Sequence, residues 1–194
     1  MALLAAYQVM LHRHSGQEKI IVGSPMPGRS EERFDRVVGD FVNPIALQAD
    51  FSGAPSAAAF LQQVRDTVLE GMEHQDLPFG ALVEQLQVER GHGRHPVFQT
   101  MFVLQNARLA AGLATLWSGQ AGQAPLAWGG LAIEGYPVAS GGGHSAFELT
   151  LEALAMDGAV RCDFKFDSGR FQPRRGGTHG WPLQCHRRRI WRHT

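Results

Sequence analysis

Two pairs of side chains in this sequence have types and spacings that could carry chemistry. His74 lies two residues before Asp76 in the stretch EHQDLPFGALVEQL at 73–86. Histidine is the commonest general base in proteins, so this pair is a candidate for acid–base catalysis. His92 and His95 have the H-x-x-H spacing that binds a metal ion when it falls on a helix.

A structural interpretation of His74 and Asp76 competes with catalysis. One apolar helical pattern ends near His74 and the next begins near Phe79, so the pair lies at a helix-to-helix corner. A cation is favoured at the C-terminal end of a helix and an anion at the N-terminal end, each by about 0.3–1 kcal/mol. Pro78 suits the first turn of the second helix because it has no N–H to leave unpaired. We favour the structural interpretation, since a general base also needs an aligned substrate and a cleft.

The other candidate sites have weaker support. His92 and His95 lie in a glycine-containing loop rather than on a helix, so we expect no metal site there. Arginines 187–189, with Trp181 and Trp191, could grip nucleic acid through phosphate contacts and base stacking. We favour a solvated or artefactual tail, and expect neither nucleic acid nor a membrane as a partner.

Composition bounds the class of protein. A chain of 194 residues, of which 44% are apolar, can bury a core, which predicts one globular domain or part of a larger one. Eighteen basic and eighteen acidic side chains cancel, so net charge gives no reason to expect an anionic partner. Two cysteines are too few for a disulfide framework. No stretch approaches the roughly 18 to 20 apolar residues of a membrane span, so we expect a soluble chain in the reducing cytoplasm.

Apolar periodicity predicts the helices of an α/β chain. Spacings of three and four residues predict helices at 3–11, at 57–72 and near 79–87. Ser56 is the expected N-cap of the second helix. Its apolar stripe consists of Ala57, Phe60, Leu61, Val64, Val68 and Met72, and the third helix should bury Leu82, Val83 and Leu86.

Alternating or continuous apolar runs predict the strands. These runs are KIIVGS at 19–24, FVNPIALQAD at 41–50, VFQTMFVLQ at 97–105 and LAIEGYPV at 131–138. Pro44 cannot donate to a ladder, so the strand at 41–50 should lie at a sheet edge or carry a local break. The run at 97–105 is apolar on both faces, as in a central strand. Residues 107–130 have no convincing period, which predicts a long loop or insertion.

The strongest hairpin signal lies at 147–166. Apolar and polar residues alternate on both sides of Asp157-Gly158, which suits a type I′ turn. Centring a two-residue turn there sets Ala153 opposite Cys162 and Leu151 opposite Phe164. The same register faces Glu152 with Asp163, a like-charge pair that leaves a slip or bulge open.

Three segments in order resemble motifs from the C-terminal half of the condensation domains of nonribosomal peptide synthetases. They are VGDFVNPIALQAD at 38–50, HQDLPF at 74–79 and RGHGRHPVFQTMFVLQN at 90–106. The flanking helix and strand before residue 30 and the hairpin at 147–167 are similar to the same family. The match covers residues 3 to 167, and three motifs at the expected spacing are far more specific than one.

The resemblance implies a fold and a reaction. The fold is α/β, a two-layer sandwich of a mixed sheet with helices, corresponding to the C-terminal half of a chloramphenicol acetyltransferase-like fold. In the family two such halves meet, and carrier-bound substrates enter the tunnel between them. An acceptor amine attacks a donor thioester, and both substrates are tethered to phosphopantetheine of peptidyl or acyl carrier proteins, so the domain itself binds no cofactor.

The family's H-H-x-x-x-D-G catalytic motif is absent from this chain. We therefore expect no catalytic residue here, a missing N-terminal condensation half as a partner, and no activity by the chain alone. Two alternatives stay open: a non-catalytic scaffold or carrier-protein-docking module, and a stand-alone acyltransferase.

The resemblance also assigns residues by position. The substrate-tunnel residues it implies are Gly39, Phe41, Val42 and Asn43. The motif residues expected to be structural are His74, Gln75, Asp76, Pro78, Phe79, Arg94, Pro96, Phe98 and Gln99.

The last segment departs from the family. We expect a partial condensation-domain C-terminal subdomain at 1–167 and an irregular basic tail at 168–194. The tail has no acidic residue and no apolar period, although the family continues there with an amphipathic helix. We hypothesise that this tail is an out-of-frame translation product of a GC-rich gene. If so, one of the other two reading frames should encode such a helix.

Overall fold

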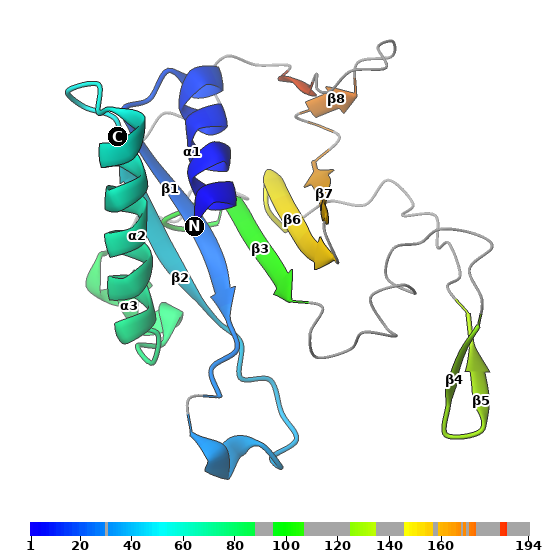
Figure 1. The fold of residues 1–194 in the computed structure, drawn as a ribbon. Helices are drawn as coiled ribbons and strands as arrows, with labels where there is room; N and C mark the ends of the chain where they lie inside the picture. Colours follow the sequence, from blue (N-terminus) through cyan, green and yellow to red (C-terminus); the bar gives the residue numbers. More distant parts are fainter. Residues whose placement is uncertain are drawn as a thin grey trace.

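The computed structural model describes residues 1–29, 31–87, 95–106, 125–134, 146–156, 159–167, 169, 171–173 and 183–185. Figure 1 shows the arrangement of its elements. The helices are α1 (Ala2–Ser15), the 3-10 helix η1 (Glu32–Phe34), α2 (Ala57–Glu73) and α3 (Phe79–Gln85). The strands are β1 (Lys19–Met26), β2 (Asn43–Asp50), β3 (Thr100–Asn106), β4 (Leu126–Trp128), β5 (Leu131–Ile133), β6 (Leu149–Met156), β7 (Ala159–Phe166), β8 (Phe171–Pro173) and β9 (Leu183–Cys185).

Five strands form one mixed sheet in the order β2-β1-β3-β6-β7. β3 runs parallel to both β1 and β6, whereas the outer pairs β1–β2 and β6–β7 are antiparallel. Helices α1 and α2 lie side by side against the sheet (Figure 1). The expected two-layer α/β arrangement is confirmed, with β3 in the central position that its apolar pattern predicted.

The core lies between the two helices and the sheet. Leu4, Tyr7 and Leu11 project from α1 onto buried side chains of β1, β2, β3 and β6. The Tyr7 hydroxyl donates to the carbonyl of Leu149 at 3.3 Å, so its one polar atom is satisfied inside the core. Burial raises the pKa of the Tyr7 phenol above its usual range, and the hydroxyl stays protonated.

The β2 strand occupies the sheet edge, as Pro44 predicted. Pro44 stands opposite Pro25 of β1, so two residues without N–H groups share the end of the ladder. Farther along β2, alternate residues point into the core: Ile45, Leu47 and Ala49. Asn43 is the first residue of this strand, which therefore starts two residues later than its pattern suggested.

The α2 helix begins at its expected cap. The Ser56 hydroxyl accepts a hydrogen bond from the Ala59 amide at 3.3 Å. Phe60 and Val64 are buried, but Leu61 and Met72 are each 45% exposed. The predicted stripe was too wide, because at 100° per residue these two side chains lie on the flank of the face that meets β2.

The α3 helix ends earlier than its apolar pattern predicted. It stops at Gln85, with Leu86 as its C-cap. Val83 is buried and Leu82 is half-buried, but Leu86 is exposed, so the prediction of a third buried residue was wrong. A helix of two turns has too short an apolar face to bury a residue at its cap.

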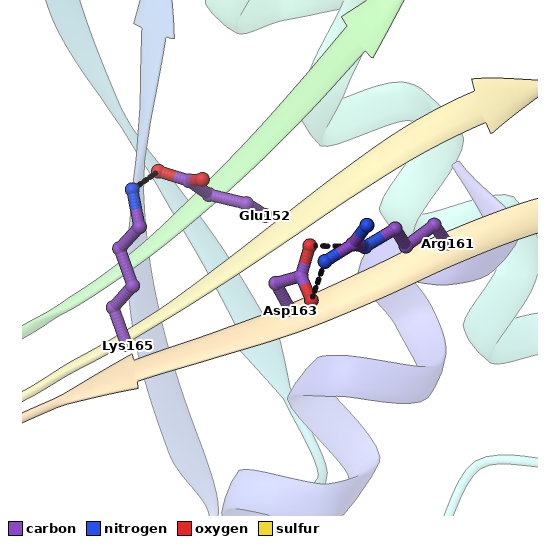
Figure 2. A network of polar contacts seen from close by, with 4 residues as sticks. All are labelled: Glu152, Arg161, Asp163 and Lys165. Carbon is purple, nitrogen blue, oxygen red and sulfur yellow. Dashed lines mark hydrogen bonds and ion pairs between the residues drawn. The ribbon is translucent and has the colours of Figure 1, made fainter. Parts of the chain in front are cut away.

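The β6–β7 hairpin has the register predicted from its alternation. Ala153 faces Cys162, Leu151 faces Phe164, and Glu152 faces Asp163 with no slip or bulge. Figure 2 shows how the two carboxylates are compensated. Lys165 contacts Glu152 at 2.6 Å, while Arg161 contacts Asp163 through two hydrogen bonds of 2.8 and 3.3 Å.

Two short strand pairs lie partly where irregular chain was expected. β4 and β5 are antiparallel around Gly129 and Gly130, both with positive φ, so part of the expected loop at 107–130 is a hairpin. β5 confirms the start of the strand expected at 131–138, and residues 135–138 lie outside the described residues. Within the segment expected to be an irregular tail, β8 pairs with β9, and Phe171 is buried in the main core.

Candidate functional site

Parts of the three motif segments meet at one corner of the fold. Asn43, at the start of β2, reaches the connection between α2 and α3. Its side-chain nitrogen donates to the carbonyls of Gln75 at 2.8 Å and Leu77 at 2.7 Å. Its side-chain oxygen accepts from the Phe79 amide at 2.9 Å. One side chain thus fixes the corner and the start of α3.

This contact explains how α3 begins. Pro78 is its N-cap residue, and its side chain makes no capping hydrogen bond. A helix start needs acceptors for its first amides, and here Asn43 supplies one from a distant strand. Pro78 was expected inside the first turn, but it precedes the first helical residue.

His74 and Asp76 both have exposed side chains at this corner. His74 is the C-cap of α2, and its amide donates to the Glu70 carbonyl at 3.2 Å. The expected position of His74 at the end of a helix is therefore confirmed. Asp76 lies in the turn before Phe79, so its expected position at the helix start was wrong. The reason is that residues 75–78 form the connection rather than a first helical turn.

The third segment joins the corner through aromatic rings. His95 stacks with Phe79 and Phe98 at centroid distances of 5.3 and 4.6 Å, and it contacts Phe147 at 4.9 Å. Phe98 is completely buried and contacts Phe79 at 5.2 Å. These four residues form an aromatic cluster that links α3 to the ends of β3 and β6.

Hydrogen bonds fix the orientation of His95 within this cluster. Its Nδ1 lies 2.8 Å from the Pro96 carbonyl, which can only accept, so Nδ1 carries the proton. Gln99 donates from its side chain to the His95 carbonyl at 3.1 Å. Arg94 and His92 lie outside the described residues. Across the described ranges, no three His, Cys, Asp or Glu side chains gather closely enough to hold a metal ion.

The cluster depends on Gly23 of β1, for which the local sequence gives no signal. A Cβ atom on Gly23 would lie 2.2 Å from Cε2 of Phe98, so only glycine lets β1 pass the buried ring. Val97 has φ +71°, an uncommon value for a β-branched residue, where the chain turns before Phe98. The expected strand at 97–105 therefore starts only at Thr100.

The residues assigned to a tunnel wall lie at the end of the β1–β2 connection. Gly39 is exposed, and Val42 is 57% exposed. Phe41 is half-buried, and its ring contacts Phe34 at a centroid distance of 5.5 Å. The Val42 amide donates to Oδ1 of Asp40 at 3.0 Å, which shapes the approach to Asn43.

A model of the condensation domain family matches residues 1–175 of this chain. Tyrocidine synthase 3 of Brevibacillus parabrevis is 41% identical over 167 residues, which is 86% of this chain. Bacitracin synthase 3 of Bacillus licheniformis is 38% identical over 172 residues, or 89% of this chain. The chain spans only 2% of the length of each synthetase.

In the part of the chain that the structure describes, no helix has both the length and the apolarity needed to cross a bilayer.

Solved structures share the fold. A four-domain nonribosomal peptide synthetase, holo-AB3403 bound to AMP and glycine, matches with a TM-score of 0.77 and 23% identity, covering 85% of this chain and 12% of that one. The starter condensation domain of rhizomide synthetase RzmA matches with a TM-score of 0.60 and 19% identity, covering 88% of this chain and 36% of that one. The X-domain in a complex with OxyB from teicoplanin biosynthesis gives a TM-score of 0.56 and 18% identity, covering 83% of this chain and 32% of that one. Because the family model matches residues 1–175 of this chain, the chain belongs to the condensation domain family of nonribosomal peptide synthetases.

Proposed function

We propose that this chain is the C-terminal subdomain of a condensation domain and contributes one wall of an acyl-transfer tunnel. The observation that carries the proposal is the convergence of the three motif segments through Asn43 and the aromatic cluster. This convergence gives the motifs a shared structural purpose. We propose that the adjoining residues Gly39 to Val42, which lead into Asn43, face substrate.

The proposed reaction joins two substrates held on carrier proteins. The amine of the acceptor attacks the thioester carbonyl of the donor, the C–S bond breaks, and the thiol of the donor's phosphopantetheine is released. The new amide stays on the acceptor carrier. A general base would assist by positioning or deprotonating the amine. His74 is exposed at a turn and His95 is held among aromatic rings, so we assign neither that role.

The imidazole for this chemistry would come from an H-H-x-x-x-D-G motif, which is absent from the 194 residues. We therefore propose that the chain acts with a complementary N-terminal portion of a condensation domain that carries this motif, and that it is inactive without it. Carrier proteins are the proposed substrate-bearing partners, since the relatives are peptide synthetases.

The pairing can be tested with separately purified proteins. The chain is mixed with the N-terminal portion of a related condensation domain, and the mixture is analysed by size-exclusion chromatography with light scattering. A one-to-one complex is expected. Two unchanged monomer peaks at micromolar concentration would contradict the proposed pairing.

A second candidate function is a docking module without chemistry. The neighbour that favours it is the X-domain, which shares the fold and was solved in a complex with OxyB. On this alternative, the chain would bind a carrier or a complementary portion, but the complex would form no amide. A stand-alone acyltransferase is the third candidate, and amide formation by the chain alone would identify it.

A further inference from the structure

The two edges of the five-stranded sheet differ in how they are protected. In the part of the chain that the structure describes, β2 forms one edge and β7 the other. An edge strand can pair with another chain unless it is very short or carries a proline or a bulge. β2 has Pro44 at its end. β7 has eight residues without a proline, and its register with β6 is continuous, so it lacks these three protections.

The backbone of β7 alternates between facing β6 and facing away from it. The Asp167 amide donates to the Glu148 carbonyl at 3.1 Å, which makes these two residues a hydrogen-bonded pair. Such pairs alternate with non-hydrogen-bonded pairs along an antiparallel ladder, so the odd-numbered residues of β7 bond to β6. The residues whose N–H and C=O groups point away from β6 are Val160, Cys162, Phe164 and Phe166.

Side chains on both faces of β7 are accessible at this edge. Val160 is 48% exposed, and Cys162 is an exposed thiol. On the other face, Arg161 and Asp163 follow one another along the strand (Figure 2), and each side chain is more than a third exposed. Lys165 continues this series, so the charges on that face alternate in sign.

The alternating charges restrict how two copies of β7 can pair antiparallel about a twofold axis. If the axis passes through Arg161, Asp163 or Lys165, that residue faces its own copy and like charges meet, which is unfavourable. If the axis passes through Cys162, Arg161 of each copy faces Asp163 of the other. This second register therefore places two pairs of opposite charges across the edge.

The length of β7 favours the same register. An axis through Cys162 pairs residues 159–165 of the two copies and sets Val160 opposite Phe164. An axis through Phe164 also opposes unlike charges, but it pairs only residues 162–166 of the strand. Each additional facing pair adds backbone hydrogen bonds or side-chain contacts, so the longer ladder is preferred.

We propose that the β7 edge is a self-association surface, at which two copies of this chain pair antiparallel about Cys162 and join their sheets. This inference goes beyond the proposed function and does not depend on it. A twofold interface uses the same edge in both copies, so the assembly closes at two. One strand pair is a small interface, and we expect a dissociation constant on the order of 0.1 mM. At micromolar concentration the chain is then a monomer.

Charge reversal in the full chain tests the register. Arg161→Asp and Asp163→Arg each set like charges opposite one another in a homodimer, and each should weaken self-association by about tenfold. In a mixture of the two variants every charge again faces its opposite, so a heterodimer should form with the affinity of the unsubstituted chain. Lys165→Met is the matched control, because Lys165 faces Ala159 in this register, and it should leave the affinity unchanged. Sedimentation equilibrium measures all four samples against the unsubstituted chain.

Cys162 provides a second measurement that needs no charge reversal. Facing residues of a hydrogen-bonded pair have Cα atoms about 5.5 Å apart, so a short bis-maleimide should link the two Cys162 thiols. The Cys185→Ser background leaves Cys162 as the only thiol of the chain. Covalent dimer is expected at about 0.1 mM, and it should decrease in each charge variant and return when the two are mixed.

Three results would each overturn the inference. The first is an unsubstituted chain that stays monomeric, without a Cys162 crosslink, at about 1 mM. The second is undiminished self-association of Arg161→Asp and Asp163→Arg, which would place the contact on another surface. The third is a mixture of these variants that stays monomeric while circular dichroism shows both folded. A loss of affinity in Lys165→Met would contradict the axis through Cys162.

Discussion

The side-chain oxygen of Asn43 accepts a hydrogen bond from the Phe79 amide at 2.9 Å, across 36 positions of sequence. The same side chain donates to two carbonyls of the α2–α3 connection. The first residue of an edge strand therefore supplies the side-chain cap that Pro78, the N-cap residue of α3, does not provide. This contact joins the segment that leads from the β1–β2 loop to the HQDLPF corner.

Removing the Asn43 side chain should destabilise the chain. Asn43→Ala leaves the Phe79 amide and two carbonyls without their partner, and the expected loss is about 1–3 kcal/mol in the free energy of unfolding. Urea denaturation followed by circular dichroism measures it. Gln48→Ala is the control on the same strand, because Gln48 is exposed, and it should change stability by less than about 0.5 kcal/mol. Equal stability of the two variants would refute the capping role.

Gly23 should tolerate no side chain while Phe98 is present. Gly23→Ala places a methyl group 2.2 Å from a buried ring atom, and the expected cost is about 1–3 kcal/mol. In a Phe98→Leu background, Gly23→Ala should cost less stability than it does in the unsubstituted chain. A double-mutant cycle measures this difference.

Gly80→Ala provides the contrast for Gly23. It lies in α3, and a Cβ atom there would meet nothing within 4 Å. The substitution should leave stability unchanged or raise it by about 0.5–1 kcal/mol, because alanine loses less backbone entropy in a helix. A loss at Gly80 as large as that at Gly23 would show that the Phe98 contact is not the cause.

The ion pairs of the β6–β7 hairpin should contribute little at high salt. A double-mutant cycle on Glu152→Gln and Lys165→Met should give a coupling of about 0.2–1 kcal/mol, since Lys165 is exposed. In 1 M salt the coupling should shrink, because the Debye length falls to about 3 Å. A coupling that is salt-independent would mean that the pair is held by packing instead of charge.

The contact between Asp50 and Ser52 at the end of β2 should depend on pH. Its carboxylate accepts hydrogen bonds from the Ser52 side chain and, at 2.8 Å, from the Ser52 amide, and these lower the pKa of Asp50. A carboxyl whose pKa is depressed on folding adds stability above its unfolded pKa of about 3.9, and that contribution is lost as pH falls through the folded pKa. The Ser52 amide resonance should therefore titrate below about pH 3.9. Titration of this resonance above that value would contradict the contact. Asp50→Asn should abolish the titration.

Local rules recovered much of the fold from sequence. The alternation at 147–166 with its two-residue turn gave the observed register, Ser56 is the predicted cap, and Pro44 marked β2 as an edge. The Gly129-Gly130 signal for a second hairpin was present but was assigned to a loop, because the flanking strands have three residues each.

The tertiary relationships could not be read from local patterns. Nothing near Asn43 indicates that its partners lie on another element, and nothing near Gly23 indicates a phenylalanine ring above it. The facing carboxylates Glu152 and Asp163 left a slip open. The sequence alone does not show that Lys165 and Arg161 reach these carboxylates and offset their repulsion. At the candidate site, the resemblance located the motif residues, but the place of His95 in the aromatic cluster emerged only from its contacts.

The most direct test of this account is amide formation measured by intact-mass spectrometry of the acceptor carrier. Donor and acceptor carriers are loaded and incubated with the chain alone, with a complementary N-terminal portion that carries H-H-x-x-x-D-G alone, and with both together. The account predicts that the acceptor carrier gains the donor acyl mass only when both are present. Product from the chain alone, or a complex of both proteins that forms none, would contradict it.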